Sequence, residues 1–363
     1  MTQRIVQIIP TMDRGGAEKQ LCLLAAGLPR DQFDVHVVLL TRDGPRSEQL
    51  RHAGIPVTVI GKRFKADPSA LFRLRKHLTQ LNPDIVHTWL FAANSFGRAA
   101  AKWAGVRRII ASERCVDPWK TSSHFWIDRQ LAKCTDAITT NSVGVRDFYA
   151  NHGIDPNLFR IIPNGIPPRS KSKISRQEAF ARLKVDPERK LILAVGRLWP
   201  QKRYRDLIWA AEMTATVRED TTLVIIGEGP QSGELLRHRD AVTAPSRVRF
   251  AGQRNDVADL LPHADVFWIG SEYEGQSNSV IEAMQAGVPV VASDIPGNRD
   301  LIVDQECGFL VEMGDTADFA RRTLTLLANP ELADRLGQAA KQRIDTKFTV
   351  ANMIAAHQSL YQE

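Results

Sequence analysis

Short apolar runs alternate along the chain with longer stretches whose apolar residues recur at helical spacing. Ile5–Pro10 predicts a strand. Gly16–Leu28 predicts a helix, because Leu21, Leu24 and Leu28 fall on one face of it. The other predicted elements of the first half are strands at Val35–Leu40, Val57–Ile60, Ile85–His87, Arg108–Ala111, Ala137–Thr140 and Arg160–Ile162 and a helix at Leu71–Leu81. Strands that alternate with helices indicate a parallel sheet covered on both faces.

This pattern stops around Pro163–Pro168 and restarts after a polar, basic stretch. The predicted strands of the second half are Leu191–Val195, Thr222–Ile226, Val248–Phe250, Val266–Ile269 and Val288–Ala292, and the helices are Tyr204–Ala215, Ser279–Ala286, Thr316–Leu327 and Val350–Tyr361. We therefore expect an α/β protein with two doubly wound, Rossmann-like domains. Ligands bind outside the carboxyl ends of such strands, so we expect a site in an interdomain cleft.

The expected domains are residues 1–168 and residues 189–345, with a linker at 169–188 between them. We expect residues 346–363 to form a helix that packs back toward the N-terminal domain. A length of 363 residues suits two domains.

Composition narrows the class of protein. No apolar run approaches the roughly 20 residues that span a bilayer, and the N-terminus lacks the pattern of a signal peptide, so we expect a cytoplasmic protein. The four cysteines form no C-x-x-C pair, which favours reduced structural thiols over a metal site. Residues 1–168 contain 23 Lys and Arg against 14 Asp and Glu, whereas the rest contains 25 against 27. The basic half is an ordinary solvated surface or binds an anionic membrane, acceptor or nucleic acid.

Two glutamates, Glu274 and Glu282, flank the start of a predicted helix. Asn278 and Ser279 are good N-caps, and the free N–H groups of a helix N-terminus attract phosphate. A carboxylate one turn into the helix can accept the two hydroxyls of a ribose, and the carboxylate on the loop can accept those of a second sugar. The spacing alone is common, and an exposed loop with a helix-start glutamate explains it equally well.

A glycine turn after the strand 191–195 precedes two cations, Arg197 and Lys202. Gly196 lets the backbone turn sharply, and arginine and lysine suit a diphosphate leaving group whose charge grows as its bond breaks. Surface salt bridges are the plainer interpretation. Gly15 and Gly16 end the first strand in a similar way and permit close approach to a phosphate or sugar.

Two nucleotide-binding motifs are absent. Pro230 and Ser232 break a G-x-G-x-x-G pattern that begins at Gly227, and no P-loop occurs, which argues against a dehydrogenase or a P-loop nucleotidase.

Together these motifs resemble the retaining glycosyltransferases of family 4, which have the GT-B fold. The motifs, in the family's order, are Gly15-Gly16-Ala17-Glu18, Ile162-Pro163-Asn164-Gly165-Ile166, Val195-Gly196-Arg197-Leu198, Gln201-Lys202, Gly227-Glu228-Gly229-Pro230, Glu274-Gly275 through Glu282-Ala283-Met284, and Gly287–Ser293 with Gly297. Each motif is weak alone, but their common order over nearly the whole chain makes the match specific.

The resemblance implies a role for each matching residue. Arg197 and Lys202 would bind the donor diphosphate, Glu282 the ribose hydroxyls, and Glu274 the transferred sugar. The implied catalytic residues are Glu274, Arg197 and Lys202, and the implied donor-binding residues are Gly15, Gly16, Gly196, Arg197, Lys202, Glu274, Gly275, Asn278, Ser279, Val280 and Glu282. It also implies no metal and no cofactor, because the nucleotide sugar is a co-substrate.

One segment departs from the family pattern. Many relatives have a histidine after the strand predicted at 108–111, where this chain has Ser112-Glu113-Arg114-Cys115. Glu113 and Arg114, or His87 at an earlier strand end, are candidates to contact the sugar or acceptor in its place. His87 is equally well explained as a packing or capping residue.

The expected enzyme is a hexosyltransferase of the retaining, metal-independent class. It would move a hexose or N-acetylhexosamine from a UDP-sugar to a saccharide or a polyprenyl-diphosphate-linked acceptor in cell-surface polysaccharide synthesis. The basic helix around Arg73, Arg75 and Lys76 would place it on the inner face of the cytoplasmic membrane, or would be a solvated helix face. The rival functions are an epimerase or hydrolase of nucleotide sugars and a non-catalytic protein that binds nucleotide sugars or nucleic acid. We expect no nucleic-acid partner, because the sequence lacks an aromatic-basic stripe.

Overall fold

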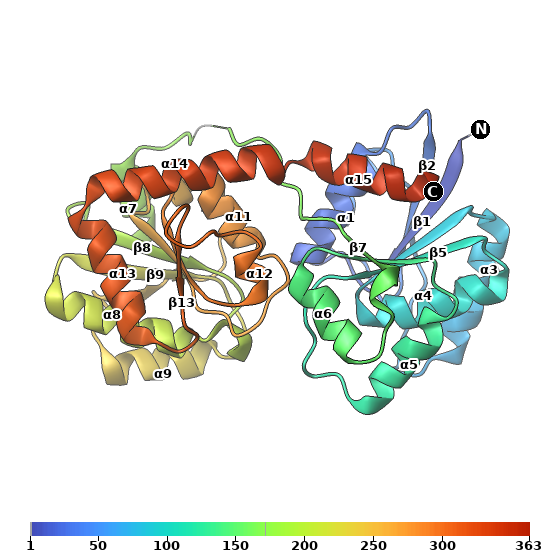
Figure 1. Ribbon diagram of the computed structural model, residues 1–363, viewed down its shortest axis with the longest axis horizontal. Coiled ribbons are helices and arrows are strands. Elements are labelled where there is room, and N and C mark those ends of the chain that lie inside the picture. Colours follow the sequence, from blue (N-terminus) through green and yellow to red (C-terminus); the bar gives the residue numbers. More distant parts are fainter. Residues whose placement is uncertain (1, 171) are drawn as a thin grey trace. The chain divides into compact units, whose positions relative to one another are not determined.

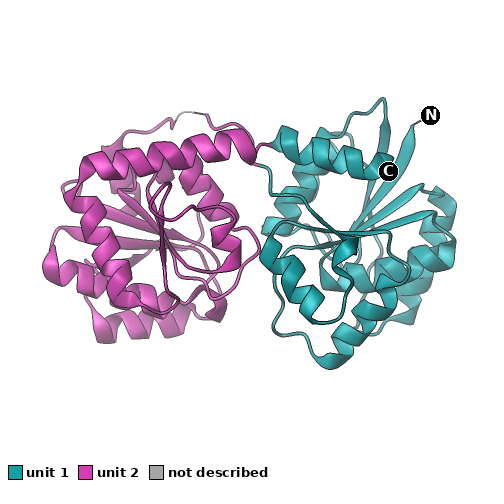
Figure 2. Ribbon diagram, viewed as in Figure 1, with its two compact units in different colours: residues 1–165, 350–363 teal, residues 166–349 magenta. Residues whose placement is uncertain are grey.

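The protein divides into two compact units, shown in Figure 2. The structure is a computed structural model that describes residues 2–170 and 172–363. Unit 1 contains the chain up to Gly165 together with Val350–Glu363, and unit 2 contains Ile166–Thr349.

Unit 1 is built on a seven-stranded parallel sheet in the order β3-β2-β1-β4-β5-β6-β7. Its strands are β1 (Gln3–Ile9), β2 (Phe33–Leu39), β3 (Val57–Val59), β4 (Ile85–Trp89), β5 (Arg108–Glu113), β6 (Ala137–Thr140) and β7 (Phe159–Ile161). Its helices (Figure 1) are α1 (Gly16–Gly27), α2 (Ser47–His52), α3 (Pro68–Leu81), α4 (Leu90–Ala104), α5 (Ser122–Ala132), α6 (Val143–Asn151), a 3-10 turn η1 (Pro156–Leu158) and the last helix, α15 (Val350–Gln362).

Alternate residues of the central strand β1 fill two cores. Ile5 and Ile9 pack among residues of α1 and α15, whereas Val6 and Ile8 pack among residues of α3 and α4. Helices therefore cover both faces of the sheet, as the near-continuous apolar strands require.

Unit 2 repeats this design with a six-stranded parallel sheet in the order β10-β9-β8-β11-β12-β13. Its strands are β8 (Lys190–Val195), β9 (Thr221–Ile226), β10 (Val248–Phe250), β11 (Val266–Ile269), β12 (Val290–Ser293) and β13 (Phe309–Val311). Its helices are α7 (Arg176–Leu183), η2 (Pro200–Lys202), α8 (Tyr204–Val217), α9 (Ser232–Val242), α10 (Val257–Leu260), η3 (Leu261–His263), α11 (Asn278–Gln285), α12 (Pro296–Arg299), α13 (Thr316–Ala328) and α14 (Pro330–Lys347).

The central strand of unit 2, β8, also faces two cores. Leu191 and Leu193 pack with residues of α7, α11 and α14, whereas Ile192 and Ala194 pack with residues of α8 and α13. The predicted fold class, two doubly wound α/β sheets, is therefore confirmed.

Some elements differ from the predicted pattern. The segment 169–188, expected as a linker, contains α7, whose Phe180 and Leu183 are buried in the core of unit 2. The short strand β13, Phe309–Val311, lies where the sequence analysis predicted no strand. Among the described residues, no helix has the length and apolar character to cross a membrane.

Candidate active site

The order of strands in unit 2 defines where a ligand is expected. The chain passes from β8 to β9 on one side and later enters β11 on the other, so β8 and β11 lie side by side but lead to helices on opposite faces. Ligands of doubly wound sheets bind at such a switch point, outside the carboxyl ends of the strands. The loops that follow β8 and β11 carry the charged residues singled out from the sequence.

Lys202 and Glu274 come together at this switch point. Lys202 lies at the end of η2, after β8, and its Nζ donates a short hydrogen bond to Oε1 of Glu274, on the loop after β11. The two side chains are 14% and 11% exposed, so the pair is half-enclosed but reachable from solvent. Ser271 donates a second hydrogen bond to the same carboxylate oxygen at 2.9 Å.

Hydrogen bonds to backbone carbonyls hold the two loops against each other. The side-chain amide of Gln201 donates to the carbonyl of Tyr273 at 2.7 Å, and the backbone N–H of Glu272 donates to the carbonyl of Gln201 at 2.8 Å. Ser293, at the end of β12, donates to the carbonyl of Ser271 at 2.5 Å. These hydrogen bonds fix the two loops, so the Lys202–Glu274 pair is pre-organised.

Two glycines of the recognised motifs are needed for this close approach. A Cβ on Gly227 would lie 1.9 Å from the carbonyl oxygen of Gly196, and a Cβ on Gly297 would lie 1.8 Å from that of Gly275. Both contacts are with backbone, which cannot move aside as a flexible side chain can, so any larger residue would force the loops apart.

Arg197 lies on the same loop as Lys202 but is exposed. Its guanidinium stands 5.3 Å from the centre of the Trp199 ring, a cation–π arrangement that leaves its donors available to solvent. The loop after β8 thus carries one exposed cation, Arg197, and a second cation, Lys202, that is paired with a carboxylate.

The helix α11 begins directly after the Glu274 loop. Ser277 is its N-cap residue, and the N–H groups of the first turn, at Asn278, Ser279 and Val280, have no carbonyl partner within the helix. These amides give the site a partial positive charge. Glu282 is half-buried one turn further on, where its charge acts on Arg169. Arg169 was not predicted, because it lies in the segment expected as a linker.

In unit 1, Gly15 is the N-cap residue of α1 and Gly16 is the first residue of that helix, so the two glycines open a helix after β1, as predicted. A Cβ on Gly15 would lie 2.0 Å from Oε2 of Glu18, whose side chain is buried. The small residue therefore leaves room for a carboxylate at the carboxyl end of β1, a feature that the sequence analysis did not anticipate.

His87 lies inside unit 1 and is fully buried. Its Nδ1 is 2.7 Å from the hydroxyl of Tyr361, and its Nε2 is 3.0 Å from that of Ser112. Burial, then the nearby His357 and Arg114, hold the pKa of His87 well below its ordinary value, so the ring is neutral. In this position the imidazole links α15 to the sheet and is enclosed by protein.

Glu113 and Arg114 point into different surroundings, although they are neighbours. Glu113 accepts hydrogen bonds from Asn94 at 2.9 Å and Tyr149 at 3.0 Å, and burial raises its pKa to about 6. Arg114 donates a short hydrogen bond to Asn164 and lies over the Trp89 ring. Burial lowers the pKa of Arg114 to about 9.

A buried lysine beside Glu113 escaped the sequence analysis. Lys120 Nζ contacts Asp128 at 2.9 Å, Glu113 at 3.6 Å and Asp117 at 3.8 Å, and its side chain is wholly buried. Burial alone would lower the pKa of Lys120, but these carboxylates raise it above its ordinary value. We call Lys120 with these three acids the Lys120 cluster. It supports the loop after β5.

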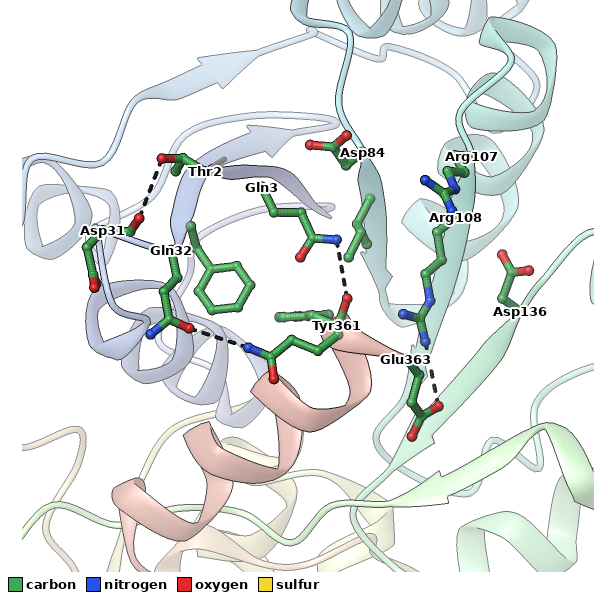
Figure 3. Close-up of a pocket in the computed structure, with 13 residues that line it drawn as sticks. Thr2, Gln3, Asp31, Gln32, Asp84, Arg107, Arg108, Asp136, Tyr361 and Glu363 are labelled. Atoms are coloured by element: carbon green, nitrogen blue, oxygen red, sulfur yellow. Dashed lines mark hydrogen bonds and ion pairs between the residues drawn. The ribbon is translucent and has the colours of Figure 1, made fainter.

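Unit 1 also has a hollow elsewhere (Figure 3). It is formed at the amino ends of the strands by residues such as Gln3, Asp84 and Arg108 and by the C-terminal Tyr361 and Glu363. Because it lies at the opposite edge of the sheet from the strand ends that bind ligands in this class of fold, it is not the candidate active site.

Comparison with known proteins agrees with this geometry. Residues 175–343 match the family model of group 1 glycosyl transferases, and residues 14–170 match that of glycosyltransferase family 4. The chain therefore belongs to the family 4 (group 1) glycosyltransferases, enzymes with the GT-B fold.

Several relatives cover nearly the whole chain. An Escherichia coli UDP-Gal:α-D-GlcNAc-diphosphoundecaprenol α-1,3-galactosyltransferase is 26% identical over 92% of this chain and 90% of its own. A Campylobacter jejuni N-acetylgalactosaminyltransferase, named for a diphospho-undecaprenol acceptor, is also 26% identical, over 95% and 94%. The crystal structure of Anabaena HepE with UDP-glucose has a TM-score of 0.88 at 21% identity and covers 99% of this chain and 100% of HepE.

Proposed function

We propose that this chain is a retaining glycosyltransferase that takes a hexose or N-acetylhexosamine from a UDP-sugar. The observation that carries the proposal is the contact of Lys202 with Glu274 at the adjoining carboxyl ends of β8 and β11. It puts a cation for phosphate next to a carboxylate for sugar hydroxyls, with the amides of α11 beside them. The relatives named for UDP-galactose and solved with UDP-glucose support the choice of nucleotide.

The chemistry follows from the charges. The anomeric C–O bond to the diphosphate breaks, and Arg197 and Lys202 stabilise the negative charge that develops on the leaving oxygen. The acceptor hydroxyl attacks the same face of the anomeric carbon, and its proton passes to the departing phosphate oxygen. The configuration is thereby retained, and the products are UDP and the extended acceptor. Positive charge on side chains does this work without a metal.

Glu274 and Glu282 have separate tasks in this proposal. Glu274, fixed by Ser271 and Lys202, accepts hydrogen bonds from hydroxyls of the transferred sugar. Glu282 accepts the two hydroxyls of the ribose, while the first-turn amides of α11 contact phosphate.

Ribose recognition by Glu282 gives a direct test in a thermal-shift assay. A ligand that binds the native state raises the free energy of unfolding and therefore the melting temperature. At a ligand concentration of a hundred times Kd, the gain in free energy is about 2.7 kcal/mol. We expect UDP to stabilise the wild-type chain more than 2′-deoxy-UDP does, and Glu282→Ala to remove that difference. Glu272→Ala, at an exposed glutamate on the loop that precedes α11, is the matched control and should keep it. A wild-type chain that does not distinguish the two nucleotides refutes the role of Glu282.

We further propose that the acceptor is a saccharide on a polyprenyl diphosphate and that α3 of unit 1 rests on an anionic membrane. Phe72 and Trp103 are 58% and 48% exposed and form an edge-to-face pair at 5.0 Å, and Arg75 lies 4.5 Å over the Trp103 ring. Exposed aromatic rings beside cations suit the interface of an anionic bilayer. The relatives whose names include undecaprenyl-linked acceptors support this choice.

Vesicle sedimentation tests the membrane surface. We expect the wild-type chain to sediment with vesicles rich in phosphatidylglycerol at low salt and to be released as salt shortens the Debye length. The variant Phe72→Ser/Trp103→Ser should lose most of this binding, whereas Trp209→Ser, an equally exposed tryptophan on α8 of unit 2, should retain it. Absence of wild-type binding, or equal loss in the control, contradicts the proposal.

A further inference from the structure

Three aromatic rings meet at the carboxyl edge of the sheet in unit 1. Phe91 lies in the first turn of α4, directly after β4, Trp119 lies on the loop between β5 and α5, and His124 lies in the first turn of α5. The ring centres are 5.4 Å apart for Phe91 and Trp119, 5.0 Å for Phe91 and His124, and 5.5 Å for Trp119 and His124, all edge to face. We call these residues the Trp119 platform.

Hydrogen bonds through Asp117 hold Trp119 in the platform. The indole N–H of Trp119 donates to Oδ1 of Asp117 at 3.1 Å, and Oδ2 of Asp117 accepts from Tyr149 at 3.0 Å. Lys120 lies 4.7 Å from the centre of the Phe91 ring, so the Lys120 cluster supports the platform as well. A tryptophan held at its N–H and along its edges has few alternative orientations.

The backbone at the base of the platform is strained. Leu90 joins β4 to α4 with φ of +67°, a left-handed conformation that is unfavourable for a residue with a large side chain. Strain of this kind is retained mainly where a functional site requires it. Here it starts the helix immediately after the strand and places Phe91 next to the Trp119 ring, edge to face.

Folding does not account for the exposure of Trp119. Its side chain is 53% exposed, although three neighbouring groups hold it in place, so a large apolar surface is kept rigid in water. The face of an aromatic ring carries negative potential and attracts the partly positive C–H groups on the apolar face of a pyranose. Asp117 lies next to it, with 21% of its side chain exposed, and a carboxylate that accepts two hydrogen bonds retains capacity for a sugar hydroxyl.

The geometry points to a subsite for the acceptor saccharide in which a pyranose ring stacks on Trp119 and donates a hydroxyl hydrogen bond to Asp117. This inference rests on the proposed glycosyltransferase function and adds the residues that would select the acceptor sugar. A polyprenyl chain is the less suitable occupant, because it would gain nothing from the carboxylate at the edge of the ring.

The test compares two soluble probes, an octyl diphosphate and the same octyl diphosphate bearing α-linked N-acetylglucosamine, measured by calorimetry with UDP present. The wild-type chain should bind the sugar-bearing probe about tenfold or more tighter, where tenfold corresponds to 1.4 kcal/mol. Trp119→Leu, which keeps apolar bulk but no ring face, should remove most of this difference, whereas Trp119→Phe should keep part of it. Trp209→Leu, at an exposed tryptophan on α8 of unit 2, should leave it unchanged.

Each other outcome counts against the inference. If the sugar adds no affinity in the wild-type chain, or if Trp119→Leu keeps the full difference, the Trp119 platform is not a sugar subsite. If Leu and Phe weaken both probes equally, the ring contacts the lipid chain instead. Failure of the proposed function would be seen in a different measurement. Trp119 variants should discriminate between UDP and 2′-deoxy-UDP as the wild-type chain does. A wild-type chain that does not discriminate between these nucleotides would count against the donor site alone.

Discussion

Removal of either partner of the Lys202–Glu274 pair should abolish most turnover without unfolding the protein. We expect Glu274→Ala and Lys202→Ala each to lower kcat by roughly 10²–10³-fold, the range found when one preorganised electrostatic contact to a transition state is removed. Glu274 would no longer orient the transferred sugar, and Lys202 would no longer stabilise the leaving diphosphate. The measurement is the initial rate of UDP release with acceptor present.

The two effects should not add. Lys202 and Glu274 are in direct contact and share Ser271 as a neighbour, and residues that act as a unit show strong coupling in double-mutant cycles. The double variant should therefore be little worse than the poorer single variant. Glu234→Ala, which removes an exposed ion pair with Arg205 elsewhere in unit 2, is the control and should keep the wild-type rate.

Wild-type rates in both single variants would refute the site. Analysis of the products completes the experiment, because the rival enzymes give different results. Free sugar formed at the same rate with and without acceptor would indicate a hydrolase, and an inverted nucleotide sugar would indicate an epimerase.

The parts of the site that were predictable are those encoded locally. Gly196, Lys202 and Glu274 follow strand ends and Glu282 lies one turn into a helix, so periodicity and helix-start signals were enough to find them. The contact between Lys202 and Glu274 could not be predicted, because it requires β8 and β11 to be neighbours although some 70 residues separate them in the chain.

The parts that were not predictable involve polar groups that fold into the interior. Lysine is rarely buried, so nothing in the sequence around Lys120 distinguishes it from a surface lysine. His87 ends a predicted strand, as a ligand-binding residue would, but its partners Ser112 and Tyr361 come from distant segments. The helix α7 was missed because its apolar residues, Phe180 and Leu183, are surrounded by charged ones.

The Lys120 cluster gives the largest expected effect on stability. Lys120→Met should lower the free energy of unfolding by about 3–5 kcal/mol at pH 8, because Glu113 and Asp117 lose the buried cation that they share with Asp128, although Asp128 keeps its ion pair with Arg98. Lys133→Met, an exposed lysine at the end of α5, is the control and should change stability by less than about 0.5 kcal/mol. Equilibrium urea unfolding measures both.

The pH dependence identifies the cause of that loss. Burial raises the pKa of folded Glu113 to about 6, above its unfolded value, so the stability it contributes is fully present below the unfolded pKa and is lost as the pH rises through 6. Without Lys120 the folded pKa of Glu113 must rise further. The penalty of Lys120→Met should therefore be smallest at pH 5 and grow toward pH 8, and adding Glu113→Gln should recover part of it. Methionine and lysine fill similar volumes, but only lysine carries a charge that offsets the acids, so we expect the charge to decide the result. A penalty that is constant or falls with pH would show instead that lost packing destabilises the variant.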